Sequence, residues 1–371
     1  VATVALLLFL NFDDLKMAVL DRGELIADNI LESAEFLRAL DAEAAEVRLK
    51  ENQVELSEIE LFLEKTRGKA LVGSISKIFP AAKDALGLIG RISAFNINLL
   101  QMAEVFSELK SFGFYYFQED GVSLIRVLSD TKQLLSNLID ETVDIQNLTA
   151  RLEGAADIFS GINQKLSGEY LAYTSEFHLW NDALGNTIGF LDTDVDRHIL
   201  LIFHNNTEIR PAGGFIGSYG VLTINGGQMT NLEVQDIYWP DHDINVTQKV
   251  VAPKILHTVT KDWGARDANW FFDFPASAET VMGFLESSKI YKDNGVVFDG
   301  AIAINTDVLG SVLRAVGPIP VPEYDLVIDE ESFLAELQRE VETGKDKEEG
   351  DNPKKILGVV APTLMERLSD L

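Results

Sequence analysis

Hydrophobic residues recur at helical spacing from residue 13 to about residue 192, which predicts helix through almost all of this half of the chain. A long amphipathic stretch covers residues 123–152, and Pro80 is the only proline of the region. This composition is typical of long antiparallel helices in a stalk or bundle. Because glycine is a poor helix former, breaks are expected at Gly68, Gly113, Gly121, Gly154, Gly168 and Gly185.

Two interpretations of these helical stripes remain open. In the first, the apolar stripes only pack against one another inside the bundle. In the second, a stripe binds a partner as a coiled coil, although the stripes do not keep a strict seven-residue repeat over several turns.

The chain opens on an uncharged, largely apolar run at residues 1–10. A helix that spans a membrane needs about 20 such residues, so residues 1–12 are interpreted as the C-terminal part of a transmembrane helix. A buried core helix and the tail of a signal peptide are the alternatives. The first charges after the run are acidic, Asp13 and Asp14, which fits the outer face of a membrane.

The pattern changes at Asp192 to short apolar runs of strand length. A turn is predicted at residues 225–227, where Asn-Gly-Gly tolerates positive φ angles. The predicted strands cover residues 198–203, 215–224, 229–238, 296–304 and 319–321.

Helices alternate with these strands. Pro275 opens one helix, which runs to Glu286, and Thr306 or Asp307 caps another, which Gly317 ends. Residues 342–352 read as a charged loop, and residues 353–371 as helix again. The predicted fold class is therefore mixed α/β: a long-helix segment at residues 13–192, then an α/β domain at residues 193–371 with a mixed sheet, a β-α-β unit and C-terminal helices.

Charge and composition exclude several classes of function. The chain has 31 basic and 59 acidic residues, a formal net charge of −28, which argues against nucleic-acid binding and against a polybasic grip on anionic lipid. It has no cysteine, so disulfides, thiol nucleophiles and cysteine-ligated metals are excluded. No phosphate-binding loop, nucleophile elbow or zinc-protease motif is present.

Two polar, glycine-containing segments are the candidates for chemistry. The first is residues 205–215, in which Gly213 and Gly214 allow close backbone approach to a ligand and Arg210 can hold a phosphate or carboxylate. The alternative is a wide strand connection in which Arg210 pairs with a local acid such as Glu208.

The second segment is residues 264–277, which lies just before a predicted helix start. Arg266 suits an anionic ligand near that helix end, and Asp267 and Asp273 suit a divalent cation such as Mg²⁺. The alternative gives Asp273 or Ser277 the role of helix cap. A weaker candidate, Asp236, ends a predicted strand as an acid near the same cleft. The triplet Asp241-His242-Asp243 is interpreted as a solvated loop rather than a metal site.

At these residues the chain resembles a bacterial family known as domain of unknown function 4012. The resemblance rests on Asn205-Asn206 with Glu208 to Phe215, on Arg266 to Trp270 with Asp273-Phe274-Pro275, and on Phe298-Asp299-Gly300 to Asn305 with Gly317-Pro318. It covers roughly residues 195–325. Members of this family usually carry an N-terminal membrane helix and a helical segment before the domain, and the family implies no established activity.

The order of elements is also similar, more distantly, to the LytR-CpsA-Psr phosphotransferases, which transfer glycopolymers from a polyprenyl pyrophosphate to the bacterial wall. By that comparison Arg266 and Asn269 resemble the Arg-x-Asn segment of those enzymes, and Asp236 resembles an acid near the phosphates. Their C-terminal arginine motifs have no clear match, because Arg339 and Arg367 are the only arginines after residue 321.

The resemblances imply a membrane-anchored protein on the extracytoplasmic face of the bacterial envelope. The leading expectation is a protein that binds a polyprenyl-phosphate lipid or a cell-wall glycopolymer, and transfers it in the phosphotransferase case. Asp236, Arg266 and Asp267 would be catalytic, Arg210, Gly213, Gly214 and Asn269 would bind the ligand, and Asp267 with Asp273 would hold Mg²⁺. The alternative is a non-catalytic envelope scaffold that binds partners through its helices.

Overall fold

The computed structural model describes residues 22–65, 80–153, 170–247, 250–258, 260–343 and 355–369. The chain forms two compact units. Unit 1 consists of the described residues within Val1–Gly113 and Ser123–Phe190, and unit 2 of those within Phe114–Val122 and Leu191–Leu371. The predicted combination of an N-terminal helical segment and a mixed sheet is confirmed. The apolar run at residues 1–12 lies outside the described residues. Within them, no helix is both long and apolar enough to cross a membrane.

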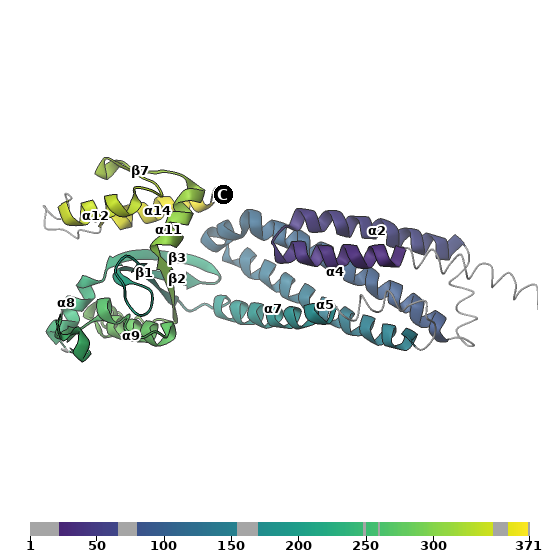
Figure 1. Cartoon of the computed structure of the whole chain (residues 1–371), viewed down its shortest axis with the longest axis horizontal. Coiled ribbons are helices and arrows are strands. Elements are labelled where there is room, and N and C mark those ends of the chain that lie inside the picture. Colours follow the sequence, from purple (N-terminus) through teal and green to yellow (C-terminus); the bar gives the residue numbers. More distant parts are fainter. Residues whose placement is uncertain are drawn as a thin grey trace, which may run out of the picture. The chain divides into compact units, whose positions relative to one another are not determined.

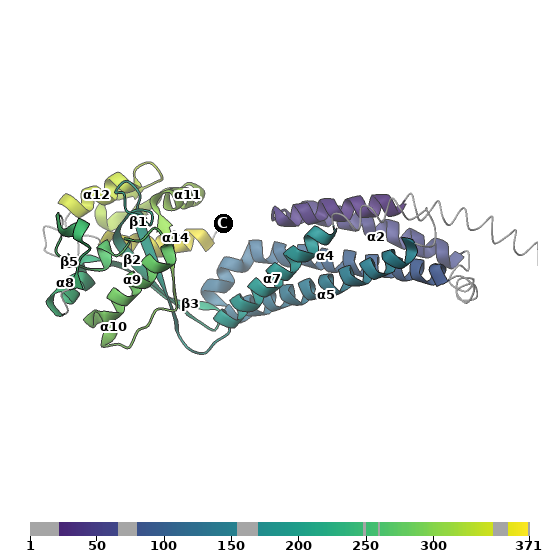
Figure 2. The same ribbon diagram turned by 60° about the horizontal axis from the view of Figure 1, so that its bottom comes forward.

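Unit 1 is built from long helices that lie side by side (Figures 1 and 2). They are a helix at residues 22–38, α2 (Ala42–Lys65), α4 (Pro80–Glu119), α5 (Gly121–Glu153) and α7 (Tyr170–Leu191).

Buried asparagines link three of these helices. The Nδ2 atom of Asn29 donates to Oδ1 of Asn52 at 2.9 Å, and Nδ2 of Asn96 donates to the carbonyl oxygen of Leu49 at 3.0 Å. Since a buried polar group without a partner is costly, these bonds fix the register of the helices. Apolar side chains at alternating three- and four-residue spacing supply the rest of the contact, as on α2: Ala42, Ala45, Leu49, Leu56 and Ile59.

Two of the predicted glycine breaks are wrong. Gly113 lies inside α4 and Gly185 inside α7. A single glycine costs a helix only about 1 kcal/mol, and the packing of neighbouring helices offsets that amount. Gly121 does mark a break, because α5 begins there. The breaks expected at Gly68, Gly154 and Gly168 lie outside the described residues.

A four-stranded mixed sheet forms the centre of unit 2, with strand order β3-β2-β1-β6. Strand β1 pairs antiparallel with β2 and parallel with β6, and β2 pairs antiparallel with β3. Strands β1, β3 and β6 therefore run in the same direction, and their carboxyl ends share one edge of the sheet. The strands are β1 (Arg197–Asn205), β2 (Phe215–Asn225), β3 (Gln228–Asp236) and β6 (Gly300–Asn305).

Helices cover one face of this sheet (Figure 1). Leu200 and Ile202 of β1 pack with Val281 and Leu285 of α9 in the core of unit 2. The elements around α9 are α8 (Tyr238–Thr247), the short 3-10 helix η3 (Ala265–Asp267) and α10 (Lys289–Lys292); α9 itself covers Phe274–Ser287. The predicted helix after Pro275 is thereby confirmed.

The C-terminal part departs from the prediction in three details. Strand β6 begins only at Gly300, and the Asp299 carboxylate just before it accepts hydrogen bonds from Arg197 and from the amide of His198. The cap of α11 (Thr306–Val316) is Asn305, whose Oδ1 accepts from the amide of Val308 at 2.9 Å.

The third departure concerns the predicted β-α-β unit. Strand β7 (Ile319–Val321) pairs with β8 (Leu326–Ile328) in a separate two-stranded sheet, rather than with the main sheet. It packs there with α12 (Phe333–Thr343) and α14 (Lys355–Ser369) around a third apolar core. Most of the loop expected at residues 342–352 lies outside the described residues. The remaining short elements are β4 (Val250–Val251), β5 (Asp262–Trp263), η2 (Lys254–Thr258) and η4 (Pro322–Tyr324).

Candidate functional site

The edge of the sheet at which β1, β3 and β6 end is the candidate site of unit 2. In open sheets with parallel strands, ligands bind outside the carboxyl ends of the strands, at the point where the connections from two neighbouring strands lead to opposite sides of the sheet. Asn206 follows β1 and joins it to the start of α11. Its Oδ1 atom accepts from the hydroxyl of Thr306 at 2.6 Å, and its Nδ2 atom donates to Asp307 at 2.8 Å.

The loop between β1 and β2 needs its two glycines. Gly213 and Gly214 have φ angles of +116° and +150°, which disfavour residues with a Cβ atom. A Cβ atom on Gly214 would lie 2.5 Å from the carbonyl oxygen of Asn205, closer than any real contact of this kind. The close approach that the sequence suggested for a ligand is therefore made by the protein's own backbone.

The two segments singled out in the sequence meet at this loop. The Nδ2 atom of Asn269 donates to the carbonyl oxygen of Gly214 at 2.6 Å, and Asn269 is buried. Although 55 residues separate the two positions, the side chain of one holds the backbone of the other.

Arg266 lies between two buried carboxylates. Its Nε atom is 3.2 Å from Oδ2 of Asp267 and 3.7 Å from Oδ2 of Asp241. Its guanidinium group also stacks on the ring of Tyr238, 5.1 Å from the ring centroid. The Arg266 side chain is 26 % exposed, while those of Asp241 and Asp267 are 2 % and 8 % exposed. Both the charge and the flat face of the guanidinium are thus engaged within the protein.

Asp241 is the site residue that the sequence did not reveal, and the solvated loop predicted around it is wrong. It lies in α8, and its carboxylate accepts from the amides of Ala265 and Arg266, at 2.5 Å and 3.4 Å. Burial raises the pKa of Asp241 to about 6, although the hydrogen bond from Ala265 and the charge of Arg266 lower it. Pro240 was the available signal, since proline favours the first turn of a helix.

The other predicted site residues are placed differently. Asp236 is buried at the end of β3 and accepts from the amide of Tyr238 at 2.9 Å. Burial raises the pKa of Tyr238. The charge of Arg266 lowers this pKa, and the charges of Asp236 and Asp267 raise it, so all three charged groups lie near the Tyr238 ring. Asp273 caps α9, accepting from the amide of Ala276 at 3.1 Å, which is one of the alternatives that the sequence left open.

Arg210 stays on its own loop and strand. It donates to the carbonyl oxygen of Ile209 at 3.0 Å and lies over the ring of Phe215, 5.1 Å from the centroid. Among the side chains that the structure describes, no carboxylate lies within ion-pair distance of it. The alternative that Arg210 pairs with Glu208 is therefore not seen among the described side chains.

The carboxylates of the site do not form a metal centre. Nowhere in the described ranges do three or more histidine, aspartate or glutamate side chains come together so that they could hold a metal ion. Asp273 is used as a helix cap, and Asp267 faces Arg266. The described geometry gives the Mg²⁺ expectation no support, and Mg²⁺ binding stays a prediction from the sequence.

A buried histidine lies beside the glycine loop. His204 is 5 % exposed, and its Nε2 atom has no hydrogen-bond partner among the described residues. Its ring packs edge-on against Phe274, with centroids 6.4 Å apart. Burial lowers the pKa of His204, so the ring is neutral at pH 7.

Large apolar side chains are exposed on the segments that form this edge. Ile209 is 87 % exposed, Trp239 is 59 % exposed and Phe272 is 92 % exposed. Exposed apolar and aromatic groups of this size are typical of surfaces that bind another molecule.

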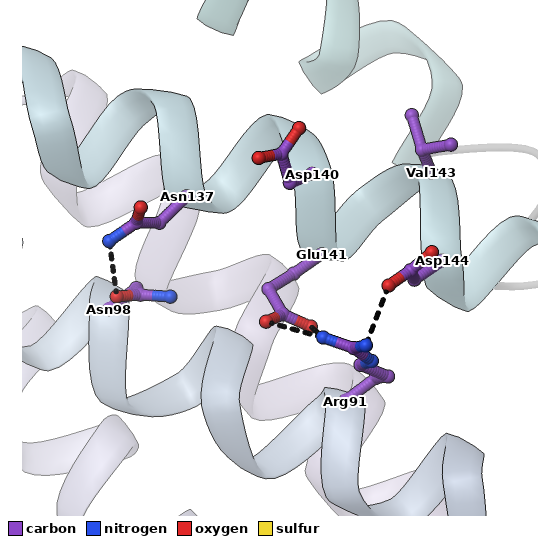
Figure 3. Close-up of a pocket in the computed structure, with 7 residues that line it drawn as sticks. All are labelled: Arg91, Asn98, Asn137, Asp140, Glu141, Val143 and Asp144. Carbon is purple, nitrogen blue, oxygen red and sulfur yellow. Dashed lines mark hydrogen bonds and ion pairs between the residues drawn. The ribbon is translucent and has the colours of Figure 1, made fainter.

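Unit 1 has a polar cleft of about 480 Å³ between α4 and α5 (Figure 3). Arg91 closes one end through ion pairs with Glu141 at 3.1 Å and Asp144 at 2.9 Å. The other end is bridged by Asn137 and Asn98, whose side-chain amides are 3.5 Å apart. Two of the three acidic groups of the cleft, Glu141 and Asp144, already have a cation in Arg91, so the cleft is a weaker candidate than the edge of the sheet.

The comparisons with known proteins support one family resemblance. Residues 194–341 match the model of a family described as "Protein of unknown function (DUF4012)". This range contains both site segments and confirms the resemblance to that family. Neither the curated proteins nor the solved structures gave a significant match. The similarity to the LytR-CpsA-Psr phosphotransferases stays a prediction.

Proposed function

We propose that this protein is a non-catalytic scaffold of the bacterial cell envelope, held at the membrane through the apolar segment at residues 1–12. The pairing of Arg266 with Asp241 and Asp267 carries the proposal. A phosphotransferase uses arginine charge to neutralise phosphate oxygens. Here two buried carboxylates, those of Asp241 and Asp267, pair with one guanidinium group. Such a cluster repels a pyrophosphate and serves instead to hold the segment at residues 264–269 against α8.

The exposed side chains at the same edge support binding without chemistry. Ile209, Trp239 and Phe272 leave apolar surface in water, which is unfavourable unless a partner covers it. The buried polar residues Asn269 and Asp241 use their hydrogen bonds on the protein's own backbone. Asn269 and Asp241 are thus committed within the protein, while these three apolar side chains are exposed to solvent.

The proposal predicts that Arg266 and Asp267 are energetically coupled. Arg266→Ala should lower the free energy of unfolding of unit 2 by about 2 kcal/mol, because it leaves two buried carboxylates without their cation. In a double-mutant cycle with Asp267→Asn, the coupling energy should be about 1 kcal/mol. Urea unfolding followed by tryptophan fluorescence measures this in a Trp180→Phe background, because the other three tryptophans, Trp239, Trp263 and Trp270, all belong to unit 2.

Arg314 and Glu330 provide the matched control cycle. They also form an ion pair in unit 2, but the Arg314 side chain is 68 % exposed. The coupling of such an exposed pair should be clearly smaller than that of Arg266 and Asp267, because water screens it. If the Arg266–Asp267 coupling is no larger than this control, the charge of Arg266 is available for a ligand and the scaffold proposal loses its basis.

Arg210 favours a second candidate, in which unit 2 binds a polyprenyl-phosphate lipid or a glycopolymer phosphate. Its guanidinium group keeps donors beyond the one used on Ile209. Gly213 and Gly214 lie beside it in the loop, and Ile209 and Phe272 offer apolar contact for a lipid chain. This candidate needs binding alone and no transfer step.

The second candidate predicts a selective loss. Flotation with phosphatidylcholine vesicles that contain polyprenyl phosphate should carry the protein, and Arg210→Ala should reduce the bound fraction at least fivefold. Vesicles without the phosphate lipid, and the variant Arg314→Ala, are the controls. Equal binding by wild type and Arg210→Ala, or binding to both kinds of vesicle alike, contradicts the second candidate.

A further inference from the structure

Helix α2 is apolar on two opposite sides. Its inner side buries Leu49 and Leu56 in the bundle at 0 % and 5 % exposure. Val47, Val54 and Leu61 point away from that side and are 57 %, 57 % and 48 % exposed. These three residues, the outer stripe, are spaced seven residues apart. Because seven residues make nearly two turns, the stripe runs almost straight along the helix.

The residue seven positions before Val47 extends this pattern. Leu40 lies in the turn that precedes α2, is 68 % exposed, and has a φ angle of +58°. Glycine or asparagine is the usual choice for this conformation, which costs a leucine about 1 kcal/mol. Burial of the side chain does not offset that cost within the described structure. Position 40 thus carries a large apolar residue, although its backbone conformation favours a small or polar one.

The charges beside the outer stripe indicate what can cover it. Helix α2 carries seven glutamates and three basic residues, which gives it a net charge of −4. Glu43 and Glu51 flank Val47, and Glu58 flanks Val54, at the three- and four-residue spacings that place side chains on neighbouring positions of a helix. Lys50 pairs with Glu46. Glu51 shares Arg48 with Glu32, and Glu58 shares Arg22 with Glu55, so the border keeps more acidic than basic groups. An apolar line with acidic borders is complementary to an apolar line with basic borders.

We infer that the outer stripe of α2 docks a basic amphipathic helix, with apolar residues seven apart and lysine or arginine beside them. The inference deepens the scaffold proposal, on which it rests for the idea that the helical unit binds protein partners. Apolar side chains of the partner helix would pack along Val47, Val54 and Leu61, as in the seam of a coiled coil. Arginine and lysine beside the seam would lie next to Glu43, and next to Glu51 and Glu58, each of which shares its arginine with a second glutamate.

A second copy of this chain fits the stripe poorly. It would place glutamates opposite glutamates, and like charges at flanking positions of a helix pair oppose association. The net charge of −28 adds a general repulsion between copies. Anionic lipid is disfavoured for the same reason.

Peptide binding to the full chain tests this inference. The probe is a fluorescent 28-residue helical peptide with leucine at every seventh position and lysine at the flanking positions. A peptide of the same composition in scrambled order, and one with glutamate in place of lysine, are the controls. Fluorescence anisotropy should show saturable binding of the basic heptad peptide alone, and Val47→Ser, Val54→Ser, Leu61→Ser combined should weaken it at least tenfold. Val122→Ser, at an exposed valine of α5, should leave the affinity unchanged.

Each other outcome overturns the inference. Equal binding of the heptad and scrambled peptides means that charge alone drives association. If wild type dimerises and the triple variant does not, the occupant is a second copy of the chain. If wild type binds neutral lipid vesicles and the triple variant does not, the occupant is a membrane. Failure of the peptide to bind, together with strong Arg266–Asp267 coupling, removes this docking surface and leaves the scaffold proposal intact. Circular dichroism of the triple variant confirms that the bundle is still folded.

Discussion

Gly214→Ala should destabilise unit 2 by about 3 kcal/mol, since it combines backbone strain with a steric overlap. A Cβ atom at this position would lie 2.5 Å from the carbonyl oxygen and 2.7 Å from the carbonyl carbon of Asn205. Both are backbone atoms at the end of β1, so a side-chain rotation cannot relieve the overlap. The carbonyl oxygen of Gly214 also accepts the hydrogen bond of Asn269, which any shift of the loop would break. Urea unfolding with tryptophan fluorescence measures the loss.

Gly226→Ala is the matched control. Gly226 also has a positive φ angle, +55°, but a Cβ atom there would have no neighbour within 4 Å. Its cost should be only about 1 kcal/mol, which is the conformational term alone. Similar losses for the two variants would mean that the loop moves away readily and that the Gly214–Asn205 contact does not hold the site together.

Replacing Asp241 should separate hydrogen bonding from charge. Asp241→Ala leaves the amide of Ala265 without its acceptor in a buried position, and we expect it to lower the free energy of unfolding by about 2 kcal/mol. Asp241→Asn keeps an acceptor oxygen and removes the buried charge. It should therefore be at least as stable as wild type at pH 7.

The pH dependence follows from the raised pKa of Asp241. Because its pKa is about 6 in the folded protein and 3.8 in a free side chain, the folded state binds the proton more tightly. Stability from this group should therefore rise as the pH falls from 7 towards 4, by about 3 kcal/mol in the limit. His204, whose pKa is lowered, acts in the opposite sense and loses stability as the pH falls through 6.5. The difference between wild type and Asp241→Asn isolates the aspartate, and a difference that does not change with pH contradicts its buried charge.

The elements of this fold were largely readable from periodicity. The long helices of unit 1 follow a spacing of 3.6 residues, and the strands β1, β2 and β3 follow from short apolar runs; both signals depend on local sequence alone. The prediction failed at Gly113 and Gly185, where tertiary packing outweighs a local preference. It also failed at β7, whose pairing partner β8 is chosen by the third core rather than by its own residues.

The site was predictable in its segments but not in its contacts. Polar residues next to glycines pointed to residues 205–215 and 264–277, and Asn269 does join the two. The ion pairing of Arg266 was not predictable, because Asp241 lies 25 positions earlier in the chain and reaches it only through the fold of α8. Whether an arginine is available for a ligand is decided by such tertiary neighbours.

Flotation of wild type and Arg266→Ala with vesicles containing polyprenyl phosphate tests the central claim most directly. At a temperature where circular dichroism shows both proteins folded, we expect the same bound fraction for the two, since Asp241 and Asp267 already neutralise Arg266. A wild type that binds these vesicles, beside a folded Arg266→Ala variant that does not, would show that the guanidinium group faces a phosphate and that the site is not merely structural.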